Sequence, residues 1–483
     1  MPRGTARLLI AAVLPLALAG CAEPVATESV ASAERLGAAE PRWADCGGEG
    51  VPADLVCAEL DVPADWDDPG GERITLHLVR AAATGDDRAG TVLFNPGGPG
   101  GSGITALARS LDTFSGLRER MDVVTWNPRG GQGTTDLPSG ACHTGPVLGT
   151  PDDEAEYDEI VRASEVARDA CREAAPVLFD AMDSASTARD MDAIRAALGE
   201  EEVNYFGNSY GGVLGATYAR LFPDRVRTMY LDSVPDHTSD LAGSERLQYE
   251  GMETAFERFV DWCAEAAECA QDGDAGQAWL ALVASAERDP VAGAGSDVRH
   301  DGDDLKLLAY PMLIRRAAWP DLSAAIAEAA AGDASRFDPQ GRGHTPQINA
   351  MLATRCGDGF LHDDYDAYTA AVERSREVSP HFWGVRENLA LACGDWPIPV
   401  ANPPAPLPAD DLPPLLGAGP LLEHPSVAAV TAQVPGSVTI GYDTTGHGLY
   451  VNEANACVIA HANRYLVEGT LPPEGTTCPP GDD

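Results

Sequence analysis

The sequence predicts an α/β protein in which a mainly parallel sheet carries helices on both faces and a helical segment interrupts the sheet. Short runs rich in β-branched and aromatic residues alternate with helical patterns, which is the order that a parallel sheet requires. Residues 236–400 instead show helical spacing and many alanine, glutamate and tryptophan residues. At 483 residues the chain is long enough for a full core and a large insertion.

The expected elements follow one another along the chain. Strands are predicted at residues 73–79, 91–95, 123–126, the run that begins at Val203, and 227–234. The helix at residues 187–198 leads into the Val203 run. The helical segment includes patterns at residues 253–270, 277–286 and 322–331, a proline-rich return covers 400–414, and the core resumes with strands at 415–419 and 437–442 and a final helix near 455–467.

The most informative stretch is residues 203–218, VNYFGNSYGGVLGATY. An apolar run stops at Gly-Asn-Ser-Tyr-Gly, and a helical pattern of small residues follows until Pro223. This is G-x-S-x-G between a strand and a helix, where close-packed glycines and a strained turn push the serine hydroxyl out over the sheet. A chance Gly-Ser turn is the alternative, and the flanking pattern favours Ser209 as a nucleophile.

A nucleophilic serine needs a base and donors for the oxyanion. His447 is the best base, because it lies C-terminal to Ser209 in a glycine-flanked loop directly after a strand. Residues 95–103, NPGGPGGSG, follow another strand, and glycines there leave backbone N–H groups free. We expect Gly98 and Tyr210 to supply the oxyanion donors. A phosphate cradle is disfavoured because no lysine follows this loop.

The charge of the chain excludes some partners. The formal net charge is −42 and the pI about 4.4, with Lys306 as the only lysine. Such a protein has no basic field with which to bind nucleic acid or anionic lipid. The composition is typical of an acidic, exported globular protein.

The N-terminus has the features of a targeting segment. Two arginines precede an apolar run that is too short to span a membrane, and residues 1–20 are read as a signal peptide. The run ends in Leu-Ala-Gly-Cys, which resembles the lipobox of bacterial lipoproteins, in which the cysteine takes a diacylglycerol. This resemblance implies lipidation at Cys21, a flexible tether over residues 21–41, and an anchor on the outer face of the cell membrane as the only membrane contact. An ordinary secretory signal, giving a secreted protein, is the alternative.

Eleven cysteines minus Cys21 leave ten, an even number that argues for disulfides in an exported protein. A scheme that joins neighbours along the chain pairs Cys46 with Cys57, Cys142 with Cys171, Cys263 with Cys269, Cys356 with Cys393, and Cys457 with Cys478. The sequence alone leaves this connectivity open. No C-x-x-C pair or Cys/His spacing supports zinc, so no metal is expected.

Together these stretches resemble the exported actinobacterial tripeptidyl aminopeptidases, relatives of proline iminopeptidase among the α/β-hydrolases. The similar segments are NPGGPGGSG at 95–103, DVVTWNPRGGQGT at 122–134, ARDMDAIRAALG at 188–199, GNSYGG at 207–212, YARLFPDRVRTMYLD at 218–232, GHGLY at 446–450 and YLVEGTLPPEGTTC at 465–478. The resemblance implies an α/β-hydrolase core, residues 42–235 and 401–483, with a helical cap at 236–400. It also implies a Ser-His-Asp triad, no cofactor, and release of short peptides or residues from a free N-terminus.

The chain departs from the family at the triad acid. Where the family has Asp, in G-x-x-D-x-x-T-P, this chain has Leu422. Glu423 is one residue further on and is an accepted type of triad acid. Asp232, at the end of the strand after the nucleophile helix, is the second candidate, and Asp443 the third. The sequence also leaves open a weak or non-catalytic relative, because loss of the acid costs about four orders of magnitude in turnover.

An enzyme that works from peptide N-termini needs an anion for the substrate ammonium. Glu250, Glu253, Asp261 and Glu265 lie in the first helical stretch of the insertion and are candidates, with Glu250 and Glu253 put first, and an ordinary solvated acidic face is the alternative. The first hypothesis is therefore a serine exopeptidase acting outside the membrane, as a monomer. A small-acyl esterase and a peptide-binding lipoprotein with a degenerate triad are the competing hypotheses.

Overall fold

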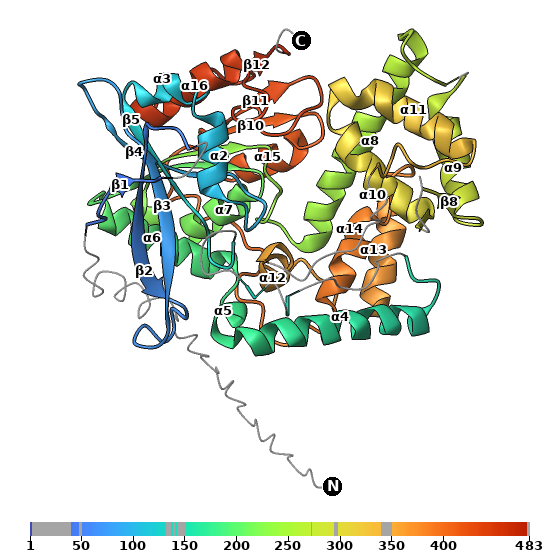
Figure 1. Ribbon diagram of the computed structural model, residues 1–483, viewed down its shortest axis with the longest axis horizontal. Helices are drawn as coiled ribbons and strands as arrows, with labels where there is room; N and C mark the ends of the chain where they lie inside the picture. The colour runs from blue at the N-terminus through green and yellow to red at the C-terminus, as the bar shows by residue number, and fades with distance from the viewer. Residues whose placement is uncertain are drawn as a thin grey trace.

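The computed structural model describes residue 1 and residues 40–47, 51–131, 137–138, 141–142, 150–271, 273–293, 298–339 and 350–480 (Figure 1). Cys21, the signal-like segment and most of the tether lie outside these described residues. None of the helices in the described ranges has the length and apolar character needed to cross a membrane.

Ten strands form one sheet in the order β1-β2-β3-β5-β4-β6-β7-β10-β11-β12. Their bounds are β1 Ala44–Asp45, β2 Leu55–Pro63, β3 Arg73–Ala81, β4 Gly90–Asn95, β5 Met121–Trp126, β6 Val203–Asn208, β7 Val226–Asp232, β10 Leu416–Pro420, β11 Val438–Tyr442 and β12 Thr477–Cys478. The pairings from β1 to β3 and of β3 with β5 are antiparallel, and all pairings from β5 to β12 are parallel. The sheet is therefore mainly parallel, as the sequence predicts.

The central strands are apolar along their length because both faces of the sheet are covered. Every residue of β4, β5 and β6 is buried. On one face the helices α2 (Gly103–Ser110), α3 (Ser115–Arg118) and α16 (Ala456–Glu468) contribute Leu107, Leu117 and Leu466 to the core. On the other face α6 (Ser184–Ala197), α7 (Gly211–Leu221) and α15 (His424–Thr431) contribute Ile194, Leu214 and Val430. The prediction of helices on both faces is confirmed.

Two parts of the sheet were not predicted from the sequence. The antiparallel hairpin of β2 and β3 is longer than the single early strand expected at 73–79, because β2 at Leu55–Pro63 alternates less regularly. The strands β1 and β12 have two residues each and sit at the edges. Such short pairings carry too little pattern to be recognised from sequence.

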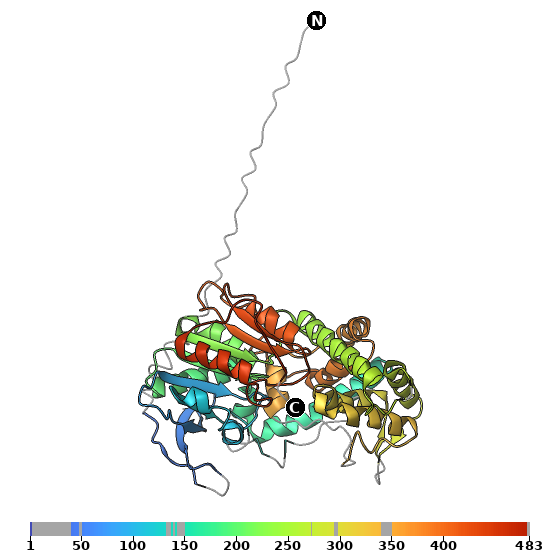
Figure 2. The same ribbon diagram turned by 90° about the horizontal axis from the view of Figure 1, so that it is seen from above.

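Between β7 and β10 the chain forms a helical region that stands beside the sheet (Figures 1 and 2). It comprises α8 Leu241–Glu265, α9 Ala275–Ala286, α10 Gly302–Leu313, α11 Trp319–Ala330, α12 Ala350–Gly357, α13 Tyr365–Val378 and α14 Val385–Ala390, with a small hairpin of β8 Val291–Ala292 and β9 Arg299–His300. The single-turn 3-10 helices are η1 Pro223–Arg225, η2 Arg316–Ala318 and η3 Leu391–Cys393. Aspartates cap α8, α9 and α10, where Asp240, Asp274 and Asp301 accept backbone N–H groups of the first turn.

The helical region has a hydrophobic core of its own. Phe256, Phe259, Trp279 and Trp319 are at most 1% exposed and belong to one cluster. Ring pairs such as Phe259 with Trp319, at 5.9 Å between centroids, have the edge-to-face geometry that aromatic pairs prefer. This region is therefore a second layer of packing rather than a loop laid over the sheet.

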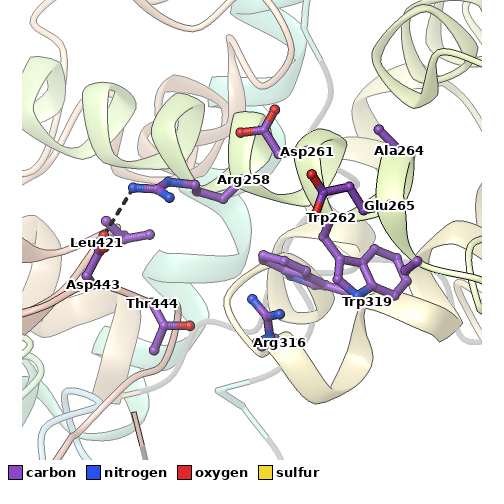
Figure 3. A pocket seen from close by; sticks show the side chains of 11 residues that line it. Arg258, Asp261, Trp262, Ala264, Glu265, Arg316, Trp319, Leu421, Asp443 and Thr444 are labelled. Atoms are coloured by element: carbon purple, nitrogen blue, oxygen red, sulfur yellow. Dashed lines mark hydrogen bonds and ion pairs between the residues drawn. The ribbon is translucent and has the colours of Figure 1, made fainter. Parts of the chain in front are cut away.

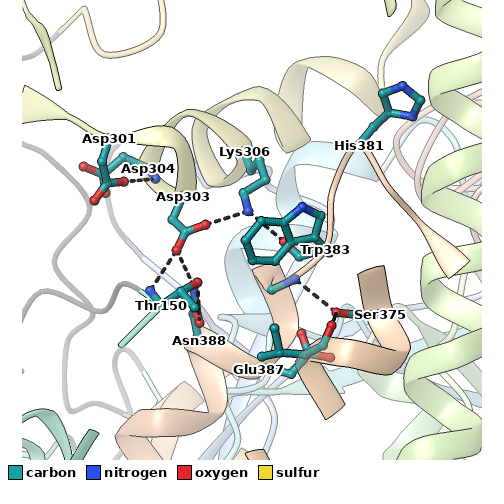
Figure 4. Close-up of polar contacts among 12 residues, drawn as sticks. Thr150, Asp301, Asp303, Asp304, Lys306, Ser375, His381, Trp383, Glu387 and Asn388 are labelled. Atoms are coloured by element: carbon teal, nitrogen blue, oxygen red, sulfur yellow. Dashed lines mark hydrogen bonds and ion pairs between the residues drawn. The ribbon is translucent and has the colours of Figure 1, made fainter. Parts of the chain in front are cut away.

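Lys306, the only lysine of the chain, forms a buried ion pair in the helical region (Figure 4). Lys306 on α10 is 1% exposed, and its Nζ lies 2.6 Å from Asp303 and 3.5 Å from the ring centroid of Trp383. Asp303 also accepts from the backbone N–H of Thr150 and from Asn388 Nδ2. This buried ion pair joins α10 and α14 to the segment that precedes α4 (Glu154–Ala174), which α5 (Pro176–Asp180) follows.

Five disulfides connect neighbouring cysteines along the chain. They pair Cys46 with Cys57, Cys142 with Cys171, Cys263 with Cys269, Cys356 with Cys393, and Cys457 with Cys478. Each crosslink closes a loop of 6 to 37 residues, so the disulfides brace local segments of both the sheet region and the helical region.

Candidate active site

The turn after β6 holds Ser209 in a conformation that few side chains adopt. Ser209 has φ of 55°, in the left-handed region, and its N–H donates to the carbonyl of Asp232 at 2.9 Å. Glycines on both sides permit the sharp turn: a Cβ at Gly207 would lie 2.6 Å from the Gly211 carbonyl oxygen. Strain of this kind persists where the surroundings fix it and is concentrated at functional sites. The turn lies at the carboxyl ends of the parallel strands, where α/β proteins bind ligands.

The loop after β4 packs directly against this turn. Gly97 has φ of 88°, and a Cβ there would lie 2.8 Å from Ser209 Cβ and 2.8 Å from the backbone nitrogen of Tyr210. Within the described part of the chain, no acceptor is present for the N–H of Gly98 or of Tyr210. The residues directly after Gly97 and Ser209 therefore each have an N–H group without a backbone acceptor, and unpaired N–H groups are what an oxyanion hole requires.

The structure brings His447 and Glu423 together. Glu423 immediately precedes α15 and His447 follows β11, and His447 Nδ1 lies 2.7 Å from Glu423 Oε1. The side chains are 32% and 11% exposed. Burial lowers the pKa of His447, but the charge and hydrogen bond of Glu423 outweigh it and raise the pKa to about 8. A carboxylate on Nδ1 leaves Nε2 as the ring nitrogen that can exchange a proton with a substrate or a serine.

The two loops that carry Glu423 and His447 are joined to each other and to the nucleophile turn. The N–H of Leu421 donates to the Thr444 carbonyl at 3.0 Å. Asn208 Nδ2 donates to the Pro96 carbonyl at 3.1 Å, and a Cβ at Gly448 would lie 2.7 Å from Asn208 Oδ1. Asn208, the residue before Ser209, therefore contacts both the glycine loop and Gly448, the residue after His447.

Asp232 performs a different task from Glu423. It is fully buried, and its oxygens accept from the backbone N–H groups of Leu449 and Tyr450 at 2.9 and 2.8 Å, and from the hydroxyls of Ser233 and Tyr230 at 2.9 and 3.0 Å. These four donors use its acceptor capacity. Asp232 therefore holds the backbone of the loop that follows His447, and only its charge acts on the His447 ring, whose pKa it raises.

The residue at the family's acid position is buried against the helical region. Leu422 is 2% exposed and packs into the hydrophobic cluster of the helical region. Helix α8 comes so close that a Cβ at Gly251 would overlap the carbonyl oxygen of Leu422. Packing of the Leu422 side chain in that direction leaves the next residue, Glu423, to turn toward the sheet edge.

Asp443 lies on the rim of an open pocket of about 610 Å³ (Figure 3). Its side chain is 75% exposed and forms an ion pair with Arg258 of α8 at 3.1 Å. Trp262 and Trp319 form one wall of this pocket, and Leu421 and Thr444 form part of the other. Asp443 thus bridges the helical region to the His447 loop without contacting the ring of His447 in the described structure.

The two glutamates expected to bind a substrate ammonium are engaged with other groups. Glu250 forms an ion pair with Arg246 one turn away on α8, and its side chain is 42% exposed. Glu253 Oε1 lies 2.6 Å from His381 Nδ1, and its other oxygen accepts from Ser379 at 2.9 Å. The structure does not bring either carboxylate into contact with Ser209 or His447.

A buried acidic pair that was not predicted from the sequence lies between α8 and α14. Glu245 of α8 and Glu387 of α14 line a pocket of about 340 Å³. Burial and the charge of Glu387 raise the pKa of Glu245 to about 8. Glu387 accepts from the Tyr249 hydroxyl, and its Oε1 has no partner among the described residues. Glu245 shares a helical face with Tyr249, Met252 and Phe256, and a carboxylate on that apolar face was the available signal.

The guanidinium of Arg355 acts on both the Tyr210 phenol and this acidic pair. Its charge lowers the pKa values of the Tyr210 phenol and the Glu245 carboxyl, although burial keeps both above their ordinary values.

Among the described residues, one group of side chains could hold a metal ion by position: Cys457, His461 and Cys478. Its two cysteines form a disulfide with each other, so their sulfurs are not available as thiolate ligands.

Comparisons with known proteins identify the family of the chain. A family model described as alpha/beta hydrolase fold matches residues 90–277, and a model described as TAP-like protein matches residues 379–478. The chain is 29% identical to "Serine protease Hip1" of Mycobacterium tuberculosis (strain ATCC 25618 / H37Rv) over 97% of this chain and 96% of the relative. It is 28% identical to "Tripeptidyl aminopeptidase" of Streptomyces lividans over 93% and 88% of the two chains. It is 30% identical to "Carboxylesterase B" of the same M. tuberculosis strain over 88% and 86%.

Proposed function

Because the chain belongs to the tripeptidyl aminopeptidase-like family of α/β-hydrolases and is a serine peptidase of that type, we propose that it releases short peptides or residues from peptide N-termini outside the cytoplasm. The observation that carries this proposal is the hydrogen bond of 2.7 Å between Glu423 and His447 at the edge of the sheet that also carries the strained Ser209 turn. A serine hydrolase needs these three groups at the carboxyl ends of its strands.

In the proposed mechanism the Ser209 hydroxyl attacks the substrate carbonyl carbon while His447 Nε2 accepts the hydroxyl proton. Glu423 stabilises the resulting imidazolium and keeps the ring in the orientation that the reaction needs. The N–H groups of Gly98 and Tyr210 stabilise the negative charge that develops on the carbonyl oxygen. His447 then returns the proton to the leaving amine. Water hydrolyses the acyl-enzyme by the same steps in reverse order.

For the free N-terminus of the substrate, Glu245 and Glu387 are better suited than Glu250 and Glu253. A buried carboxylate pair gains more from an ammonium ion than a solvated one, since the ammonium relieves the repulsion between the two acids. Glu245 lies 3.6 Å from His362 Nε2 and Glu387 accepts from Tyr249, but Glu387 Oε1 has no hydrogen-bond partner among the described residues, which supports this assignment. We place this ammonium site in a helical cap formed by residues 236–400.

The substrate assignment is tested with matched peptide amides, one with a free N-terminus and one N-acetylated. We expect Glu245→Gln and Glu387→Gln to raise KM for the free peptide about 10- to 150-fold, as loss of a charged hydrogen-bond partner of about 1.5–3 kcal/mol predicts, with KM for the acetylated peptide unchanged. Glu250→Gln is the control on the exposed part of the same helix and should leave both KM values unchanged. Equal hydrolysis of the free and acetylated peptides would contradict exopeptidase action.

An esterase acting on small acyl groups is the second candidate function, favoured by the relative named carboxylesterase B. Rates on a tripeptidyl amide and on a p-nitrophenyl ester separate the two activities. A serine peptidase hydrolyses both substrates well, whereas an esterase hydrolyses the ester and turns over the amide poorly. Labelling by a fluorophosphonate that Ser209→Ala abolishes is the expected result in both cases. Folded protein without labelling would instead favour a peptide-binding lipoprotein.

We propose that the mature chain begins at Cys21, carries a lipid there, and faces the outside of the cell. The five disulfides support an oxidising environment. We expect Cys21→Ser to release the protein from the membrane fraction, and mass spectrometry of the N-terminal peptide to detect a diacylglycerol on Cys21. An unmodified N-terminus after a different cleavage site would identify an ordinary secreted protein.

A further inference from the structure

The residue after the nucleophile is held by its side chain as well as by its backbone. Tyr210 precedes α7, and its N–H is one of the two donors assigned to the oxyanion hole. Its ring is 5% exposed and packs on Phe360 with 5.9 Å between centroids. Its hydroxyl donates to Asp358 Oδ2 at 2.7 Å. The direction of the Tyr210 backbone is therefore coupled to the position of a buried carboxylate.

Asp358 is fully buried and joins segments that are far apart in the sequence. Besides the Tyr210 hydroxyl, it accepts from the backbone N–H and hydroxyl of Ser184 at 2.8 and 2.6 Å, and from Asn402 Nδ2 at 3.0 Å. Its backbone carbonyl lies 2.8 Å from His237 Nε2. Asp358 thus connects the start of α6, the nucleophile turn, the segment after β7 and the proline-rich return.

The contacts of Asp358 separate into two kinds. Ser184 and Asn402 satisfy the carboxylate within the framework, where a carboxylate left without donors would be costly. The Tyr210 hydroxyl is the one contact that continues into the catalytic turn. A donor for an oxyanion is effective only when it is fixed before the reaction, since reorganising it during the reaction cancels part of its benefit.

We propose that Asp358 is a positioning residue for catalysis, which fixes the oxyanion donor of Tyr210 through the phenol of the same residue. This inference rests on the proposed role of Tyr210 as a donor. Complete removal of an oxyanion donor lowers kcat by about 10²–10³. Because the N–H remains present and only its orientation is loosened, we expect a smaller loss, about tenfold.

The test uses Tyr210→Phe, Asp358→Asn and the double variant that combines these two changes. Ser184→Ala is the variant with which they are compared. Ser184→Ala removes a different hydrogen bond to the same oxygen of Asp358 and serves as the matched control. The measurements are kcat and KM on an amide or ester, affinity for a peptide aldehyde whose oxygen occupies the oxyanion hole, and the rate at which a fluorophosphonate modifies Ser209. Circular dichroism checks that each variant is folded.

We expect Tyr210→Phe to lower kcat, aldehyde affinity and the phosphonylation rate about tenfold each, with KM within twofold. Asp358→Asn should produce the same loss. The double variant should be no worse than Asp358→Asn, because both changes remove the same contact between the Tyr210 hydroxyl and the Asp358 carboxylate. Ser184→Ala should match the wild type. Wild-type phosphonylation by Tyr210→Phe, or strictly additive losses, would overturn the proposal. The phosphonylation rate needs no peptide substrate, so an incorrect exopeptidase assignment would leave this result intact.

Discussion

Glu423 and Asp232 are two carboxylates that flank the same histidine loop, yet their environments differ. Asp232 is completely buried and receives four hydrogen bonds, two of them from the backbone of Leu449 and Tyr450. Glu423 has a partly exposed side chain, one oxygen on His447 Nδ1, and an Oε2 without a partner among the described residues. A carboxylate whose acceptor sites are full can hold a loop, whereas one with spare capacity can respond to a new positive charge on the imidazole. These environments are the reason that we propose Glu423, rather than Asp232, as the acid of the triad.

The sharpest way to break this comparison is Glu423→Gln. An amide on Nδ1 removes the charge that stabilises the imidazolium and no longer selects the reactive tautomer, so we expect kcat to fall about 10³–10⁴-fold. The free energy of unfolding should change by less than about 1 kcal/mol, since Glu423 supports one hydrogen bond. Steady-state kinetics and urea unfolding measure the two effects. Near-normal kcat would transfer the role of the acid to Asp232.

Placing Asp at position 422, where the family carries its acid, in the Glu423→Gln variant tests whether the turn at residues 422–423 can present position 422 to His447. We expect Leu422→Asp combined with Glu423→Gln to remain as inactive as Glu423→Gln alone. The side chain at 422 points into the hydrophobic cluster of the helical region, where a carboxylate would lie far from His447 and would destabilise the fold. Recovery of activity in the double variant would show that the turn can reverse.

For Asp232→Asn we expect the opposite balance of effects. The amide nitrogen would face a backbone N–H donor, and one buried hydrogen bond would become a repulsive contact. The free energy of unfolding should therefore fall by about 2–4 kcal/mol. The fraction that remains folded should still react with a fluorophosphonate at Ser209. A variant as stable as the wild type but without activity would assign Asp232 a catalytic role.

The pH dependence of phosphonylation sharpens the comparison further. Reaction requires neutral His447, whose pKa of about 8 lies above that of ordinary histidine, so the rate should rise with pH and level off above about 8. Without the charge of Glu423, only the charges of Asp232 and Glu453 oppose the effect of burial on the His447 pKa, so the rate of Glu423→Gln should level off at a lower pH than that of the wild type. A stopped-flow or plate assay between pH 5 and 10 measures both profiles. An unchanged midpoint in Glu423→Gln would contradict the assigned contact.

The smallest effect is expected at the third carboxylate, Asp443. Its ion pair with Arg258 is exposed, and pairs of this kind contribute about 0–1 kcal/mol. Asp443→Asn should leave kcat within twofold and shift the free energy of unfolding by less than about 0.5 kcal/mol. A large loss of activity would mean that the contact between α8 and the His447 loop controls the position of the base.

The nucleophile turn could be predicted from sequence because its constraints are local. Gly207, Ser209 and Gly211 fall within one turn, and the flanking strand and helix are readable from neighbouring residues. The sequence could not decide whether Glu423 or Asp232 is the acid, because that decision depends on the direction in which the Leu422 side chain points. That direction is set by Gly251 and the cluster around α8, far away in the chain.

The acidic residues of the helical region show the same limit. Glu250 and Glu253 lie in the right helix for a substrate contact, but their partners Arg246, His381 and Ser379 become visible only when the helices are assembled. Glu245 carried a local signal through its apolar helical face. Its pairing with Glu387 depends on the contact between α8 and the later helices, which no pattern in either segment encodes.

The contact between Gly251 and Leu422 also bears on how a substrate arrives. Since α8 has no room for even a methyl group at this point, the helical region cannot slide along that edge without displacing the turn that carries Glu423. Any opening movement at this edge would first have to separate α8 from the backbone of Leu422.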